Sequence, residues 1–377
     1  MKILFYYPQH FNRSAAGTNP FFDPMLKACD EAGIKYDLYE EPDGGTDKPH
    51  NGKAKSAKCF YWTVTILRKL VSLICRKQDF YAREVHVAQI LNLLTFGKWK
   101  YDRYITISGS MYHLFANLNP KAPVFDMQHG ILYKHHPTFF DPQTFKLRPV
   151  FYRPNLHWLF FGEGYKECFV RGEEEHTDGK AHVVGCEMGQ DDSSFGNPQS
   201  HTILYSLQFT DDWTQDRLFR MKKLIEDSLE PLRGTGMKVL LRHHPRFNNV
   251  IPMDDIAERF DFVEYTSESL QELYKKTFLH VTYFSTTAFE FSSQGIPTVF
   301  LHCDDLGRLE RDFYEEFGYP LYDGLSITNV LERLKDEDNY REDSEKVKEW
   351  YRKFYSDFDK EKFLEILKNV KLTPKNI

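Results

Sequence analysis

The sequence lacks the signatures of a metal centre, a disulfide framework and a membrane-spanning helix. Its 6 cysteines are scattered without a Cys-x-x-Cys pair, so neither a zinc site nor a set of disulfides is predicted. No stretch approaches the roughly 18 apolar residues that a spanning helix needs, because Arg68 and Lys69 interrupt the best candidate. The N-terminal apolar run reaches Pro8 too soon for a signal peptide. We therefore expect a cytoplasmic protein.

An excess of basic residues is also missing. The 49 lysines and arginines are outnumbered by 55 acidic residues, and the formal net charge of −6 gives no reason to expect nucleic acid as a partner. Apolar residues, in contrast, are plentiful: 41% of the chain is hydrophobic and 16% is aromatic, which argues against disorder. With 377 residues, the chain is long enough for two domains of ordinary size.

Short β-branched and aromatic runs alternate with longer helical patterns, which is typical of parallel sheets covered by helices. A polar stretch at 189–201 separates two such series. We predict an N-terminal Rossmann-like domain on the acceptor side over 1–190, a linker over 191–200, a C-terminal Rossmann-like domain that binds the donor nucleotide over 201–345, and C-terminal helices over 346–377. The predicted strands lie near 2–7, 35–39, 103–107, 123–127, 157–161, 181–184, 202–207, 238–242, 261–265, 278–284 and 297–301.

Ligands of such folds bind outside the carboxyl ends of the strands, so polar residues at those ends are the first candidates. The predicted strand at 280–284 runs into Ser285, Thr286 and Thr287. Thr287 and Glu290 have the spacing of a capping box, which gives these residues a purely structural role. The alternative is a phosphate site made of hydroxyls, unpaired N–H groups and the helix dipole. Three consecutive hydroxyl residues exceed what a cap requires.

A second candidate is the cationic cluster at 242–246, which directly follows the apolar run 239–241. A His-Pro pair after a strand is often only a turn. However, the cluster precedes the hydroxyl residues by about 40 positions, and neighbouring parallel strands would bring both segments to one cleft. Arg242 and His244 would then neutralise the phosphate of a leaving group.

A third candidate lies in the first half of the chain, where His129 follows an apolar strand that contains Asp126. A neutral histidine is suited to take a proton from an acceptor hydroxyl, and Asp126 would orient or replace it. Glu163 is a further candidate acid or base. A backbone hydrogen bond within the loop is the structural alternative for His129. A zinc site with His135 and His136 is not supported, because these histidines lack H-x-H or H-E-x-x-H spacing.

Four motifs together resemble bacterial surface-polysaccharide transferases of the GT-B fold, over about 125–300 of this chain. They are Gln-His-Gly at 128–130, Phe-Gly-Glu at 161–163, His-Pro at 244–245 and the segment from Ser285 to Pro297. The chain is most similar to the CDP-glycerol glycerophosphotransferases of teichoic-acid synthesis and more distantly similar to bacterial sialyltransferases with His-Pro and Ser-Ser/Thr motifs. The resemblance implies an α/β fold with two Rossmann-like domains facing across a cleft.

The resemblance also implies roles for the candidate residues. In the glycerophosphotransferases the histidine of the His-Gly turn is catalytic, which assigns this role to His129. In both groups the His-Pro histidine and the hydroxyl pair contact the donor phosphate, which assigns this role to His244 and to the hydroxyls of 285–287. One departure is Gln128, because glycerophosphotransferases commonly have tryptophan before the histidine.

The implied reaction is a metal-independent inverting displacement without a cofactor. It transfers a sugar or polyol phosphate from a nucleotide-activated donor to a glycan or lipid-linked glycan acceptor of a surface polysaccharide. A CMP- or CDP-linked donor is favoured because both related groups use cytidine nucleotides, and a UDP-sugar fits the same site. The alternatives are a nucleotide-sugar epimerase or hydrolase of the same fold, and a non-catalytic subunit that binds a nucleotide or glycan.

Residues 53–77 combine lysines and arginines with an aromatic and apolar helical pattern. One interpretation is an interfacial helix that contacts the inner face of the membrane through anionic headgroups. The other is a helix that packs on the core and has a basic outer edge. The sequence supports both equally.

Overall fold

The computed structural model forms two compact units, which are Met1–Met188 together with Tyr355–Ile377, and Gly189–Phe354. The structure describes residues 1–44, 48–134, 136, 138–187, 196–209, 213–244, 250–302 and 313–370. Each unit is built on one parallel sheet. Much of the predicted linker, residues 191–195, lies outside the described residues.

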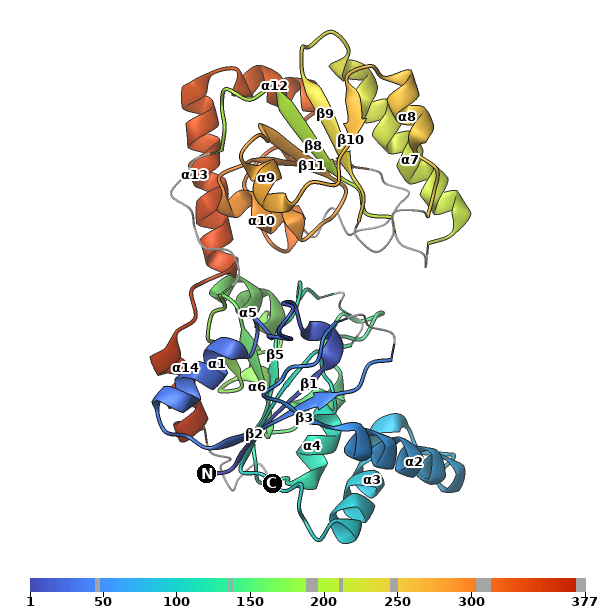
Figure 1. The fold of residues 1–377 in the computed structure, drawn as a ribbon, viewed down its shortest axis with the longest axis vertical. Coiled ribbons are helices and arrows are strands. Elements are labelled where there is room, and N and C mark those ends of the chain that lie inside the picture. The colour runs from blue at the N-terminus through green and yellow to red at the C-terminus, as the bar shows by residue number, and fades with distance from the viewer. Residues whose placement is uncertain are drawn as a thin grey trace. The chain divides into compact units, whose positions relative to one another are not determined.

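The sheet of the first unit has the strand order β3-β2-β1-β4-β5-β6-β7 (Figure 1). Its strands are β1 (Ile3–Pro8), β2 (Tyr36–Glu41), β3 (Lys55–Ser56), β4 (Arg103–Ile107), β5 (Val124–Met127), β6 (Leu156–Phe160) and β7 (Ala181–Val183). Its helices include η1 (Gln9–Phe11), α1 (Asp23–Glu31), α2 (Lys58–Ile74), α3 (Phe80–Leu94), α4 (Tyr112–Leu118), η2 (Pro149–Tyr152), α5 (Glu163–Val170), α6 (Glu174–Thr177) and α14 (Lys360–Asn369). The order reverses between β1 and β4, so right-handed crossovers place α1 and α4 on opposite faces.

The central strands of this sheet are buried on both faces, as expected of parallel strands between helix layers. All four residues of β5 are buried, and the polar one among them is Asp126. Aromatic rings fill the space beneath α4: Phe115 lies 5.2 Å from Tyr6 and 5.1 Å from Tyr104, measured between ring centroids. Such pairs contribute about 0.5–1.5 kcal/mol each beyond their burial. A rigid core therefore supports the carboxyl edge of the sheet.

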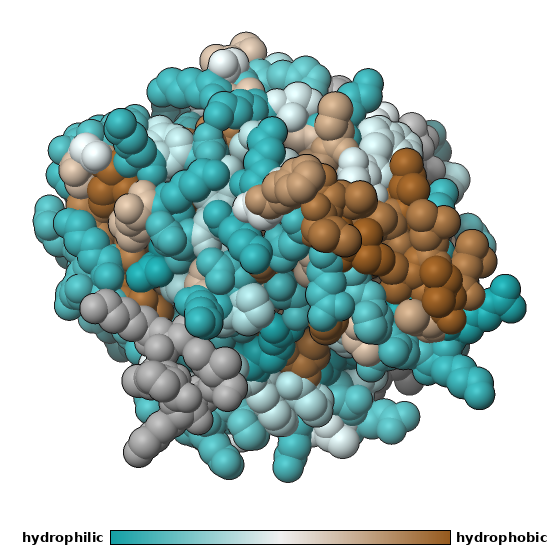
Figure 2. Space-filling view, turned by 90° about the horizontal axis from the view of Figure 1, so that it is seen from below, coloured by the Kyte–Doolittle hydropathy of each residue, from teal (hydrophilic) through white to brown (hydrophobic). Residues whose placement is uncertain are grey.

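Helices α2 and α3 leave many apolar side chains in solvent. Figure 2 shows an apolar area on the side of the first unit where these helices lie. Its most exposed members include Ile74, Leu93 and Phe96. The two helices therefore have apolar residues on their solvent-facing side as well as on the side that packs on the core.

The sheet of the second unit has the strand order β10-β9-β8-β11-β12. Its strands are β8 (Thr202–Ser206), β9 (Lys238–Arg242), β10 (Val263–Tyr265), β11 (Leu279–Thr282) and β12 (Thr298–Phe300). Its helices include α7 (Gln215–Leu229), η3 (Glu230–Leu232), α8 (Asp254–Arg259), α9 (Leu270–Tyr274), α10 (Thr287–Ser293), α12 (Ile327–Leu334) and α13 (Glu337–Phe354). Here the order reverses between β8 and β11, which makes these two strand ends the switch point of the sheet.

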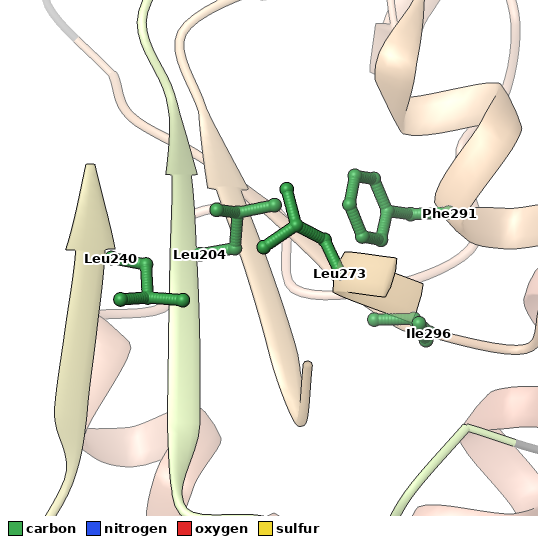
Figure 3. Packing of buried hydrophobic residues seen from close by; sticks show 5 residues of the cluster. All are labelled: Leu204, Leu240, Leu273, Phe291 and Ile296. Atoms are coloured by element: carbon green, nitrogen blue, oxygen red, sulfur yellow. The ribbon is translucent and has the colours of Figure 1, made fainter. Parts of the chain in front are cut away.

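One face of this sheet is packed against α9 and α10. Leu204 of β8 and Leu240 of β9 meet Leu273 of α9, Phe291 of α10 and Ile296 in one buried cluster (Figure 3). Full burial of such a side chain contributes about 1.5–3 kcal/mol. The cluster fixes α10, and with it the turn that precedes this helix.

The predicted fold, two Rossmann-like α/β domains, is confirmed. Each predicted strand is present within a few residues of its expected bounds, whereas the short strand β3 was not predicted. The C-terminal helices do not form a separate tail, since α13 belongs to the second unit and α14 to the first. The interactions that hold α14 include the pair of Lys360 with Glu31 at 2.6 Å and a hydrogen bond from the Arg103 guanidinium to the carbonyl of Leu367. The sequence pattern also predicts a helix near 307–317, and part of this range lies outside the described residues.

Candidate functional site

The carboxyl edge of the second sheet brings three strand ends together. In the strand register Ser206 is paired with Arg242 of β9 on one side and with Thr282 of β11 on the other. The prediction that the strands before the cationic cluster and before the hydroxyl turn are neighbours is wrong, because β8 lies between them. Strands in a sheet are about 4.8 Å apart, so β9 and β11 are separated by roughly 10 Å.

The hydroxyl turn at 285–287 is held by side chains that the sequence did not single out. Ser285 is buried, and its Oγ accepts hydrogen bonds from Gln208 Nε2 at 2.7 Å and from Thr287 Oγ1 at 2.8 Å. Gln208 follows β8, so this bond crosses the switch point. Thr286, in contrast, is exposed and makes no side-chain cap to the helix. Of the three hydroxyls, Thr286 is therefore the one presented to solvent.

The predicted capping box of Thr287 and Glu290 is not formed. Thr287 is already the first residue of α10, and Glu290 accepts a hydrogen bond from Tyr274 at 3.2 Å instead of reaching back to the helix start. Burial raises the pKa of Glu290, while Tyr274 and the positive charge of Arg242 oppose this rise. A capping box with the same spacing occurs at Ser269 and Glu272, before α9.

The neutral ring of His280 lies beneath the turn and forms hydrogen bonds with the neighbouring segments. Its ring is buried between Ser206, 2.9 Å from Nε2, and Thr298, 3.0 Å from Nδ1, and Nε2 lies 3.4 Å from Thr287 Oγ1. Burial lowers the pKa of His280 to about 3, so the ring carries no charge near neutral pH. It joins three strands to the turn without adding a cation to the site.

The cationic cluster is only partly a surface feature. Arg242 and His244 are half-buried, and Arg242 Nε donates to the carbonyl of Glu268 at 3.4 Å. The ring of His243 stacks on Tyr265 of β10, with centroids 5.3 Å apart and planes within 6°. Pro245 and Arg246 of this cluster lie outside the described residues. The structure thus leaves Arg242 and His244 as the cationic and imidazole groups at this edge.

In the first unit, His129 follows β5 at the carboxyl edge. Its ring packs edge-on against Phe11 with centroids 5.5 Å apart, and Nε2 lies 3.5 Å from the Oγ of Ser108. Burial lowers the pKa of His129 to about 4, and the nearby His136 and His10 add to this effect. The ring is therefore neutral at pH 7, which is the state a general base needs.

Asp126 does not orient His129 directly. Its buried carboxylate accepts the backbone N–H of Gly109 at 2.9 Å. Ser108 and Gly109 both have left-handed backbone angles, with φ of 60° and 66°, and such a conformation costs a non-glycine residue about 1–2 kcal/mol. Burial raises the pKa of Asp126 to about 7. Asp126 therefore stabilises the turn that carries Ser108 to His129.

Gln128 interacts with the turns at the carboxyl edge of the first sheet, whereas Glu163 pairs with a surface lysine. Gln128 is buried and bridges two turns, since it donates to the Gly130 carbonyl at 2.7 Å and accepts from the Phe161 N–H at 3.0 Å. Glu163 is exposed at the start of α5 and pairs with Lys166 at 3.0 Å. The structure thus brings Gln128 to the His129 turn and turns Glu163 towards a surface lysine.

A second histidine at this edge was missed by the sequence analysis. His10 follows β1, and its Nδ1 lies 2.7 Å from Oδ2 of Asp43, with both side chains about one-third exposed. The signal that would have found the pair is the strand register, because Pro8 is paired with Glu41 and each partner lies two residues further on. His10 and Ser108 thus follow β1 and β4, the two strands of the switch point.

The described parts of both units contain no group of three His, Cys, Asp or Glu side chains that could hold a metal ion. Of the three histidines considered for zinc, His135 lies outside the described residues.

Comparison with known proteins gives one family match and several similar folds. Residues 192–371 match the model of the CDP-Glycerol:Poly(glycerophosphate) glycerophosphotransferase family. No curated protein sequence matches this chain. The resemblance to glycerophosphotransferases is thus confirmed over this region, and the similarity to sialyltransferases stays a prediction.

Three solved structures illustrate the similarity of fold. The structure of S. aureus MnaA with UDP has 13% identity and a TM-score of 0.56, with 97% of this chain and 96% of that chain covered. A variant of the wall teichoic acid polymerase TagF has 14% identity and a TM-score of 0.53, with 97% and 87% covered. The UDP-GlcNAc 2-epimerase of Methanocaldococcus jannaschii, in complex with UDP-GlcNAc and UDP, has 13% identity and a TM-score of 0.52, with 97% and 99% covered.

At these identities the similarity concerns the fold. The chain therefore has the two Rossmann-like domains of the GT-B fold, and its residues 192–371 are similar to the CDP-glycerol:poly(glycerophosphate) glycerophosphotransferase family.

Proposed function

We propose that this chain transfers a sugar or a polyol phosphate from a nucleotide-activated donor to a glycan acceptor of a bacterial surface polysaccharide, without a metal ion. The observation that carries the proposal is the turn at 285–287, which lies at the switch point of the second sheet and within the region that matches the family. A buried hydroxyl, Ser285, keeps the turn in place, and an exposed hydroxyl, Thr286, faces solvent. Nucleotides bind at such edges of α/β sheets.

The second unit would hold the phosphates of the donor. Thr286 would donate a hydrogen bond to a phosphate oxygen, and Arg242 would supply a permanent positive charge from the end of β9. His244 would add a further donor at the same edge. These groups would stabilise the negative charge that grows on the departing nucleotide, which is the electrostatic contribution such a displacement needs.

The first unit would supply the base. Nε2 of a neutral His129 would take the proton of an acceptor hydroxyl while the acceptor oxygen forms its bond to the transferred carbon or phosphorus atom. The bond from that atom to the nucleotide phosphate oxygen breaks in the same displacement, and the nucleotide leaves with its electron pair. Ser108 contacts His129, and Asp126 stabilises the Ser108 turn, so both are positioning residues.

His10 is a second candidate for the base because Asp43 engages its Nδ1. A carboxylate on one ring nitrogen holds an imidazole in one orientation and leaves Nε2 to accept a proton. His129 has no carboxylate partner of this kind in its described surroundings. Separate alanine variants of the two histidines distinguish the candidates.

The favoured donor is linked to CMP or CDP, since the matching family is named for CDP-glycerol. UDP-linked donors remain the alternative, because two of the structures with a similar fold contain UDP. The fold similarity to the UDP-GlcNAc 2-epimerase of Methanocaldococcus jannaschii supports a second candidate function, a nucleotide-sugar epimerase or hydrolase.

The test begins with a thermal-shift panel of CMP, CDP, UDP, GDP and dTDP on the full chain, because a ligand of the folded state raises its apparent stability. We expect stabilisation by cytidine or uridine nucleotides. The corresponding donor is then incubated with and without a glycan acceptor. Nucleotide release that requires the acceptor supports transfer, whereas release without it indicates hydrolysis. Failure of every nucleotide to stabilise the protein would refute the proposed donor site.

A further inference from the structure

Exposed apolar side chains are concentrated on one part of the first unit. Of the 15 large hydrophobic residues that are exposed in the described chain, 11 lie between positions 62 and 96. Figure 2 shows an apolar area on the side of the first unit where α2 and α3 lie. We call this area, formed by the exposed apolar residues at 62–96, the α2–α3 surface. Patches of this kind on soluble proteins mark interaction sites.

Helix α2 is apolar on two sides. Phe60, Val64, Leu67 and Val71 follow helical spacing and are buried against the unit. A second row with the same spacing, Trp62, Ile66, Leu70 and Leu73, is between 51% and 60% exposed. One side of α2 therefore packs on the core, as the second interpretation of the sequence predicted, and the other side exposes apolar residues to solvent.

Helix α3 and the segment after it extend the surface, which the sequence analysis did not foresee. Leu93 is 76% exposed, Leu94 is 59% exposed and Phe96 is 97% exposed. The two helices are joined by a bidentate ion pair, in which the Arg68 guanidinium donates to both carboxylate oxygens of Glu84 at 2.7 and 2.8 Å. Arg68 therefore connects the helices, and it is not available as a headgroup ligand.

The charge of this region is opposite to that of the chain. Residues 58–100 contain eight basic and two acidic side chains, whereas the whole chain has a net charge of −6. The acidic two are engaged inside the region, since Glu84 pairs with Arg68 and Asp79 caps α3. Lys69, Lys77 and Lys98 are exposed. Apolar side chains flanked by cations fit the boundary between acyl chains and anionic headgroups.

We propose that the α2–α3 surface docks on the surface of an anionic lipid bilayer. The described chain contains no helix with both the length and the apolar content to cross a membrane. A second copy of the chain fits the surface less well. In a two-fold dimer the same patch meets itself, and the cations of the two copies would face each other. This proposal is independent of the reaction proposed above.

The test is flotation of the full chain with vesicles of phosphatidylcholine alone and of phosphatidylcholine with about 30% phosphatidylglycerol. We expect flotation with the anionic vesicles, little with the neutral ones, and a loss of binding as salt is raised, because salt screens the headgroup attraction. The double variant Leu73→Ser/Leu93→Ser changes one exposed residue on each helix and should lose at least tenfold in partitioning. Lys77→Glu/Lys98→Glu should lose binding to the anionic vesicles.

The matched control is Phe219→Ser, because Phe219 is 61% exposed on α7 of the second unit. It should float like the unchanged chain. Absence of flotation with anionic vesicles would overturn the proposal, as would equal binding by both double variants and the control. A dimer that the Leu73→Ser/Leu93→Ser variant dissociates, without any vesicle binding by the unchanged chain, would identify a second copy as the occupant instead.

Discussion

Gln208 donates a hydrogen bond from its Nε2 to the Oγ of Ser285 at 2.7 Å, and this bond ties the segment after β8 to the segment after β11. The two strands are neighbours at the point where the strand order of the second sheet reverses. Ser285 also accepts from the hydroxyl of Thr287. The turn is therefore organised by its own side chains, and Thr286 is left at its surface.

Ser285→Ala should destabilise the second unit. The change removes the acceptor that half-buried Gln208 and Thr287 share, and a hydrogen bond typically contributes about 0.5–1.5 kcal/mol. Urea unfolding measures this loss. Thr286→Val is the matched control, because Thr286 is exposed and makes no cap, and its effect should stay within about 0.5 kcal/mol. Equal effects of the two changes would contradict the structural role of Ser285.

His129→Ala should lower kcat by about 10²–10⁴-fold if His129 is the base. The pH dependence follows from its pKa of about 4. The ring loses its basic form only as the pH falls towards 4, so the rate of the unchanged enzyme should not drop near pH 6.5 because of this residue. Steady-state kinetics from pH 5 to 8 measure both effects. Full turnover by His129→Ala, together with a loss in His10→Ala, would assign the base to His10.

Asp126→Asn should change how stability depends on pH. Burial raises the pKa of Asp126 to about 7, so the folded protein retains a proton there that the unfolded chain loses near pH 4. The stabilisation from this proton is complete at low pH and is lost as the pH rises towards 7. Asparagine keeps an oxygen for the N–H of Gly109 and does not titrate. Relative to the unchanged chain, the variant should gain about 1–3 kcal/mol between pH 5 and pH 8.

Urea unfolding at the two pH values measures that gain. If the difference between Asp126→Asn and the unchanged chain were the same at pH 5 and pH 8, the raised pKa of Asp126 would be wrong.

Glu84→Gln should weaken the attachment of α2 to α3 and lower the free energy of unfolding. It leaves the guanidinium of Arg68 facing an uncharged side chain in a largely buried position, and breaking such a pair costs roughly 3 kcal/mol. Unfolding measurements on Glu332→Gln provide the control, since the pair of Glu332 with Lys335 is more than 70% exposed on both sides. That change should cost less than about 0.5 kcal/mol. A similar small effect of Glu84→Gln would show that the ion pair does not join the helices.

The fold and the strand-end residues were predictable because their signals are local. A buried parallel strand is a short apolar run, and the first polar residues after it mark the carboxyl edge. This rule located His129, Arg242 and the hydroxyl residues at 285–287. In the structure, His129 and the hydroxyl residues follow strands, and Arg242 is the last residue of β9.

The other features of the candidate site depend on contacts between segments that are distant in the sequence. The position of β8 between β9 and β11 is a property of the whole sheet, so Gln208 gave no signal of its own. The pair of His10 and Asp43 likewise requires the pairing of β1 with β2. Sequence spacing alone also gave a wrong prediction. Thr287 and Glu290 have the same spacing as Ser269 and Glu272, but of these two pairs only Ser269 and Glu272 form a capping box.

The most direct test of the central claim is calorimetric titration of CDP and UDP into the unchanged chain, Thr286→Val and Thr286→Ser. One of the two nucleotides should bind. Valine should weaken this binding by about 10–100-fold, because a hydrogen bond to a charged phosphate is worth roughly 1.5–3 kcal/mol. Serine, which keeps the hydroxyl, should bind as the unchanged chain does. Unchanged affinity in Thr286→Val would contradict the assignment of the turn as the phosphate site.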